Sequence, residues 1–142
     1  MGLGKTLQGI TLLWTLLQNG HDLLGAAPLA KRAIIVCPTS LVANWDNECR
    51  KWLQVPLLQA RVWYYIHHGA PQGRLNTLPL CESSRDDVIH SISQFLAPQN
   101  FFKVLIVSYE TFRLHAERFA APWSCDLLIC DEVGPPAGCK QL

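Results

Sequence analysis

Long apolar runs, an excess of charge and paired cysteines are all missing from this sequence. No apolar run approaches the ~20 residues of a membrane-spanning helix, so no span and no membrane partner are predicted. The net charge is only +1, so a nucleic-acid site would have to be a local patch. None of the six cysteines forms a C-x-x-C pair, which argues against zinc. Cys37 and Cys130 end apolar runs and are predicted to be buried thiols, which suits a reducing compartment.

The composition is that of a folded domain with a real core. The chain has 142 residues, of which 49% are hydrophobic and 16% charged. Continuous apolar runs predict strands buried on both faces at residues 33–37, 103–107 and 126–130. Helical spacing of apolar residues predicts helices at residues 4–18, 41–53, 83–96 and 109–119. This alternation predicts an α/β fold with a parallel sheet covered by helices on both faces.

Two of the predicted helices have specific apolar faces. The first helix is so apolar that we expect it to be mostly buried, through Leu7, Ile10, Leu13, Trp14 and Leu17. The second helix is expected to turn its apolar side inward, through Leu41, Val42, Trp45, Cys49 and Trp52. Thr39 and Ser40 are its N-cap candidates.

The opening residues contain the second half of a phosphate-binding loop, G-x-x-x-x-G-K-[ST], as Gly4-Lys5-Thr6. Glycines let backbone N–H groups face phosphate oxygens, and the following helix adds the positive end of its dipole. Lys5 would reach the β- and γ-phosphates, and the Thr6 hydroxyl would bind Mg²⁺. The first glycine position and the strand before the loop would precede Met1, so we expect an incomplete lobe.

Two other interpretations of the N-terminus exist. Met1-Gly2-x-x-x-Thr6 fits a myristoylation pattern, and Lys5 followed by the apolar run 10–17 resembles a signal peptide. Neither explains why the later motifs fall where a nucleotide-hydrolysing fold needs them. We therefore rank both below the phosphate-binding loop.

A pair of carboxylates, Asp131-Glu132, follows the last predicted strand. Asp131 would hold Mg²⁺, largely through water, and Glu132 would orient and deprotonate an attacking water. Thr39 and Ser108 also follow predicted strands directly. Because parallel sheets bind ligands at the carboxyl ends of their strands, we expect these residues to share one edge with Lys5.

Four motifs stand in an order that resembles a known family. They are Met1-Gly2-Leu3-Gly4-Lys5-Thr6-Leu7-Gln8, Val36-Cys37-Pro38-Thr39-Ser40-Leu41-Val42-x-Asn44-Trp45, Val107-Ser108-Tyr109-Glu110-Thr111-Phe112 and Leu127-Leu128-Ile129-Cys130-Asp131-Glu132. Together they closely resemble the first RecA-like lobe of the Swi/Snf family of DNA-dependent ATPases, within helicase superfamily two. Residues 108–115 look like its recombinational-repair branch, the Rad fifty-four translocases.

The resemblance implies a P-loop NTPase fold, ATP and Mg²⁺ as cofactors, and a role for each motif. The nucleotide-binding residues would be Gly2, Leu3, Gly4, Lys5, Thr6 and Leu7. Lys5 and Glu132 would be catalytic, and Thr6 and Asp131 would hold the metal. The hydroxyl residues Thr39, Ser40, Ser108 and Thr111 would touch the DNA phosphate backbone, as hydroxyls and helix N-termini can.

The resemblance further implies a parent protein that is an ATP-driven translocase on double-stranded DNA. Such a protein would act in homologous recombination and chromatin remodelling, in the nucleus, with a RecA-type recombinase as partner. Helix capping alone would also explain the four hydroxyl residues, and a cap can still hold a phosphate.

The remaining expectations come from the positions at which this sequence differs from the family pattern. The last of the four motifs continues as Val133-Gly134-Pro135-Pro136, without the expected histidine, and nothing matches a second lobe with its arginine finger. We interpret residues 1–132 as a partial first lobe, with 54–79 as an insertion candidate, and residues 133–142 as a tail outside the family pattern. We expect marginal stability and no DNA-stimulated ATP turnover. The alternatives are a non-catalytic interaction or competitor fragment and a small P-loop kinase, although no cluster of lid arginines supports the kinase.

Overall fold

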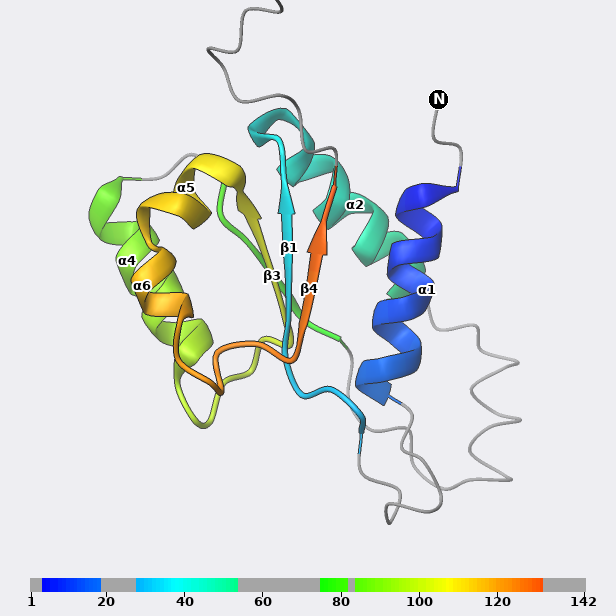
Figure 1. The fold of residues 1–142 in the computed structure, drawn as a ribbon. Helices are drawn as coiled ribbons and strands as arrows, with labels where there is room; N and C mark the ends of the chain where they lie inside the picture. Colours follow the sequence, from blue (N-terminus) through cyan, green and yellow to red (C-terminus); the bar gives the residue numbers. More distant parts are fainter. Residues whose placement is uncertain (1–3, 19–27, 54–74, 82–83, 132–142) are drawn as a thin grey trace, which may run out of the picture.

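The computed structural model describes residues 4–18, 28–53, 75–81 and 84–131, and these form one parallel sheet with helices on both faces (Figure 1). The strands are β1 (Ala33–Cys37), β2 (Thr77–Pro79), β3 (Val104–Ser108) and β4 (Leu127–Cys130). The helical elements are α1 (Lys5–Gln18), η2 (Thr39–Leu41), α2 (Val42–Leu53), α4 (Arg85–Leu96), α5 (Tyr109–Leu114) and α6 (Ala116–Phe119). The expected α/β class is confirmed. No helix in the described ranges is long and apolar enough to span a membrane.

The strand order β2-β3-β1-β4 puts the two fully buried strands, β1 and β3, in the middle of the sheet. Ile35 of β1 pairs with Ile106 of β3 on one side and with Ile129 of β4 on the other. Every residue of β1 and of β3 is buried, as expected for parallel strands covered on both faces. The two runs read from the sequence therefore form the centre of the fold.

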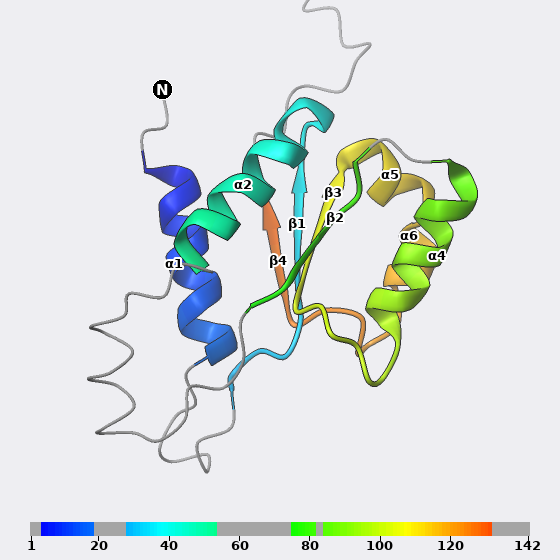
Figure 2. The ribbon, with the colours of Figure 1, turned by 180° about the vertical axis from the view of Figure 1, so that it is seen from behind.

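The sheet separates the core into two layers, and helices cover each layer (Figure 2). On one face, α1 and α2 cover a cluster that includes Ile35 and Ile106. On the other face, α4, α5 and α6 cover a cluster that includes Ile34, Leu105 and Phe95. Alternate residues of each central strand thus enter opposite layers, as the pleat of a strand requires.

The first helix is less buried than its composition predicts. Ile10, Leu13 and Leu17 lie in the core, but Leu7 and Trp14 are 42% and 43% exposed. Only one stripe of α1 faces the sheet and α2, so the rest of its apolar surface stays outside. In α2 the expected inward position of Trp52 is wrong as well, because its indole N–H donates to Glu48 at the surface.

Burial of Cys37 is confirmed, whereas the expected burial of Cys130 is wrong. Strand β4 packs Leu127 and Ile129 towards α1 and α2, and turns Leu128 and Cys130 to the opposite face. In the described part of the chain, no helix covers that face at β4, and Leu128 is 46% exposed. The thiol is therefore exposed on an edge strand, beside Tyr109 of α5.

Strand β2 was not predicted from the sequence. It lies inside residues 54–79, which we interpreted as an insertion candidate, yet it pairs with β3 through Thr77 and Leu78. Residues 77–79 are therefore part of the sheet, while 54–74 lie outside the described residues. Pro79 at the end of an edge strand costs no ladder bond within the sheet.

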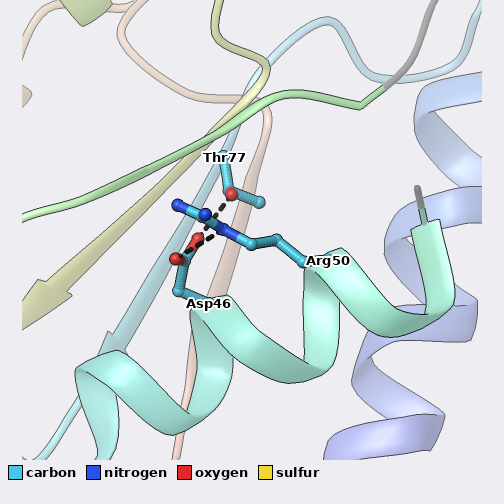
Figure 3. Close-up of polar contacts among 3 residues, drawn as sticks. All are labelled: Asp46, Arg50 and Thr77. Atoms are coloured by element: carbon cyan, nitrogen blue, oxygen red, sulfur yellow. Dashed lines mark hydrogen bonds and ion pairs between the residues drawn. The ribbon is translucent and has the colours of Figure 1, made fainter.

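A buried polar contact ties β2 to α2 (Figure 3). The Thr77 hydroxyl donates to Asp46 Oδ1 at 2.6 Å, and Arg50 Nε lies 2.8 Å from Asp46 Oδ2. Asp46 and Thr77 are 7% and 8% exposed, so their hydrogen bond is shielded from water.

Helix ends follow the predicted signals in part. A serine cap was the sequence signal for α4, from Ser83 or Ser84, and Ser84 provides it by accepting the Asp87 N–H. The helix predicted at 109–119 is two short helices, because His115 leaves the helical conformation at φ −112° and ψ 19°. Thr39 and Ser40 do not cap α2, because they lie inside η2, whose N-cap is Pro38.

Candidate functional site

The candidate site lies at the edge of the sheet where the strands end. In Figure 1 the amino end of α1 and the carboxyl ends of β1, β3 and β4 all lie at the top of the molecule. Lys5 begins α1, and Asp131 directly follows Cys130, the last residue of β4. The two ends of the predicted nucleotide site therefore belong to the same edge of the fold.

At the start of α1, a glycine with positive φ directly precedes the first helical residue. Gly4 has a φ of +118°, a conformation that side chains with a Cβ rarely adopt. The Gln8 N–H donates to the Gly4 carbonyl at 2.7 Å and closes the first turn. Lys5 is exposed and Thr6 is half-buried. The first N–H groups of a helix have no partner within the helix, and the Lys5 side chain beside them is exposed.

Asp131 is held by three hydrogen bonds from three different elements. Its N–H donates to the Val36 carbonyl of β1 at 2.8 Å, which extends the sheet pairing by one residue. Its carbonyl oxygen accepts the Tyr109 hydroxyl of α5 at 3.1 Å. Its Oδ2 accepts the indole N–H of Trp45, from α2, at 2.8 Å. Both the main chain and the carboxylate of Asp131 are therefore fixed.

The neighbours of Asp131 are kept uncharged. Burial raises the pKa of the Cys37 thiol to about 12, and the nearby Asp131 carboxylate adds to this rise. Burial also raises the pKa of Tyr109, with further contributions from Cys130 and Asp131. A neutral thiol and a neutral phenol add no negative charge beside the Asp131 carboxylate, which suits a cation ligand.

The four hydroxyl residues predicted to contact DNA differ in accessibility. Thr39 and Ser40 are exposed in η2, directly after β1. Ser108 is 4% exposed; its Oγ accepts the Thr111 N–H at 3.1 Å and donates to Thr111 Oγ1 at 3.0 Å. Ser108 thus fixes the first turn of α5 and orients the half-buried Thr111.

The described residues include Gly4, Lys5, Thr6, Leu7 and Asp131, whereas Gly2, Leu3 and Glu132 lie outside them. No group of three or more metal-ligating side chains occurs within the described ranges. Thr6 and Asp131 nevertheless suit Mg²⁺, because this ion takes one or two protein oxygens and fills its other positions with waters and phosphate oxygens.

Sequence reasoning missed the contacts that Trp45 and Tyr109 make with Asp131. Trp45 was expected to face inward, which is confirmed, since it is 2% exposed. Its polar atom was not considered, although a buried indole N–H needs an acceptor. That rule could have directed attention to a carboxylate at the edge.

Comparison with known proteins agrees with this geometry. The family model described as "SNF2-related domain" matches residues 1–135. The chain is 53% identical over 133 residues to "DNA repair and recombination protein RAD54" of Oryza sativa subsp. japonica, covering 94% of this chain and 11% of that protein. It is 49% identical over 133 residues to "Protein CHROMATIN REMODELING 25" of Arabidopsis thaliana, covering 94% and 12%.

A vertebrate relative shows the same pattern at lower identity. "DNA repair and recombination protein RAD54-like" of Danio rerio is 39% identical over 135 residues, covering 93% of this chain and 15% of that protein. The chain thus spans between 11% and 15% of the length of these three relatives. The resemblance drawn from the four motifs is confirmed: this chain belongs to the SNF2-related domain family, of Swi/Snf and RAD54 type.

Proposed function

We propose that this chain binds Mg²⁺-ATP between the amino end of α1 and Asp131, and the DNA phosphate backbone at the adjoining strand ends. The observation that carries the proposal is the shared edge of the sheet, where α1 begins after Gly4 and β4 delivers Asp131. The work of the parent protein would be ATP-driven movement along double-stranded DNA in recombinational repair. The names of the relatives support a role in DNA repair, and this role implies the nucleus.

Each residue has a distinct task in this proposal. The N–H groups of the first turn of α1 and the Lys5 ammonium would bind the β- and γ-phosphates. The Thr6 hydroxyl and the Asp131 carboxylate would hold the metal, and Glu132 would orient the attacking water. Bound Mg²⁺ would neutralise charge on the phosphate oxygens. For the 142 residues alone we propose binding without DNA-stimulated turnover, because they contain no match to the arginine finger.

The DNA contacts in the proposal are non-specific. Hydroxyls of Thr39, Ser40 and Thr111, with Ser108 fixing the turn of α5, would bind phosphate oxygens and would not read bases. A RecA-type recombinase as partner follows from the family resemblance and is part of the same proposal.

Titration of the 142-residue chain with a fluorescent ATP analogue tests the nucleotide site. We expect saturable binding in Mg²⁺ that weakens strongly when EDTA removes the metal, because Thr6 and Asp131 act only through it. A phosphate-release assay with duplex DNA accompanies the titration. Absence of saturable binding, or DNA-stimulated phosphate release, would contradict the proposal.

The DNA site is tested with a double variant, Thr39→Ala with Ser40→Ala. Each hydrogen bond to a phosphate contributes about 0.5–1.5 kcal/mol, so losing two of them should lower the affinity for duplex DNA by roughly tenfold. The loss should be equal for duplexes of unrelated sequence. Thr15→Ala is the matched control, because this exposed hydroxyl lies in α1 and bonds within its own helix. An equal loss in the control would show that Thr39 and Ser40 have no such role.

A further inference from the structure

Trp45 connects α2 to two other elements of the candidate site. Its indole is 2% exposed and lies against Gly9 of α1, where an added Cβ would stand 3.0 Å from Trp45 Cη2 and 4.0 Å from Ile129 Cδ1 of β4. The absence of a side chain at Gly9 lets α1 approach the ring this closely. The ring therefore lies between the helix that begins at Lys5 and Asp131, which directly follows β4.

The polar end of the same ring meets the carboxylate. Trp45 Nε1 donates to Asp131 Oδ2 at 2.8 Å, while the opposite end of the ring is packed against Gly9. An indole N–H is neutral and can only donate, so it orients the carboxylate without cancelling its charge. Because the ring is buried and packed, the direction of this N–H is fixed by the core.

The carboxylate is held independently of its backbone. Tyr109 and Val36 bind the main-chain oxygen and nitrogen of Asp131, and only Trp45 binds its side chain among the described residues. With Oδ2 engaged by the indole, Oδ1 is the oxygen that can turn to a cation. Mg²⁺ demands near-ideal octahedral geometry, so a carboxylate held in one orientation favours its binding.

We propose that Trp45 is a positioning residue for the metal, which fixes the Asp131 carboxylate in the orientation that Mg²⁺ needs. This inference rests on the proposed Mg²⁺-ATP site and adds to it the residue that sets metal affinity. Groups that hydrogen-bond a metal ligand commonly change metal affinity about 10- to 100-fold when they are lost. The same ring packs against Gly9 of α1, so it also links α1 to Asp131.

The test compares two tryptophan-to-phenylalanine variants of the whole chain. Trp45→Phe keeps a packed aromatic ring and removes the N–H. Trp52→Phe is the matched control, because Trp52 lies in the same helix and its Nε1 also donates to a carboxylate, Glu48 Oε2, at 2.8 Å, but at the surface. A fluorescent ATP analogue is titrated at a series of Mg²⁺ concentrations and in EDTA.

We expect the Mg²⁺ concentration for half-maximal binding to rise about tenfold in Trp45→Phe, with binding in EDTA unchanged. Trp52→Phe should match the wild type in both conditions. In an Asp131→Asn background, Trp45→Phe should cause no further loss, because the carboxylate that it positions is gone. A purely structural effect of the smaller ring would lower binding in EDTA as well, and would persist in that background.

The outcomes separate this inference from the function on which it rests. If the wild type shows no Mg²⁺-dependent binding, the proposed function fails and the role of Trp45 fails with it. If the wild type binds and Trp45→Phe has the same Mg²⁺ dependence as Trp52→Phe, only the positioning role is overturned.

Discussion

Lys5→Ala is expected to weaken Mg²⁺-ATP binding to the 142-residue chain by about 10- to 100-fold. Lys5 is the first residue of α1, directly after Gly4 at φ +118°, and it is exposed at the edge where β4 ends. A hydrogen bond from a charged donor to phosphate contributes about 1.5–3 kcal/mol, which corresponds to that range of affinity. Calorimetric or fluorescence titration in Mg²⁺ measures the change.

The control for this prediction removes the same charge elsewhere. Lys51 lies in the last turn of α2, 3.8 Å from Glu48 and over the Trp52 ring, so Lys51→Ala changes the net charge equally without touching the proposed site. We expect its nucleotide affinity to match the wild type. If the two variants lose affinity equally, Lys5 acts only through net charge and its phosphate role is refuted.

Asp46→Ala is expected to lower the free energy of unfolding by about 2–3 kcal/mol. The variant removes a charged acceptor and leaves the Thr77 hydroxyl, 8% exposed, without its 2.6 Å partner. Hydrogen bonds to charged groups contribute about 1.5–3 kcal/mol, and a buried group left unpaired adds to the loss. The Arg50 pair contributes little, because the arginine side chain is 56% exposed. Urea unfolding followed by circular dichroism gives the value.

Two further variants show whether the loss comes from the link between α2 and β2. Glu48→Ala removes a carboxylate from the same helix, where its partners Trp52 and Lys51 lie at the surface, so its loss should stay near or below about 1 kcal/mol. Thr77→Val in the Asp46→Ala background should cost less than in the wild type, because its partner is already absent. Equal losses in Asp46→Ala and Glu48→Ala would refute the link.

The central strands and the sheet edge that holds the candidate site could be predicted because short stretches of sequence specify them. Continuous apolar runs predicted β1, β3 and β4. The glycine and lysine fall at the start of α1, and the carboxylate directly follows β4. Parallel topology then predicted that these ends share an edge, as the structure shows for α1 and β4. The metal and nucleotide roles of these residues stay predictions.

The errors came from features that depend on partners far away in the sequence. Strand β2 has only three residues, and it is stabilised by β3 and by Asp46 of α2. The exposure of Trp14 and Cys130 depends on which helices cover each face, and periodicity does not record this. The bond between Trp45 and Asp131 joins residues 86 positions apart. No local pattern specifies such a pair.

The most direct test of a single nucleotide site between α1 and the end of β4 is paramagnetic broadening by Mn²⁺. Mn²⁺ prefers the same oxygen ligands and octahedral geometry as Mg²⁺. With Mn²⁺-ADP bound to the labelled chain, the amide signals of Thr6 and Asp131 should broaden together in NMR spectra. Those of Phe101 and Asp126, which precede β3 and β4 at the opposite edge, should stay sharp. Broadening of Thr6 without Asp131, or of Phe101 as strongly as either, would contradict the site proposed for this chain.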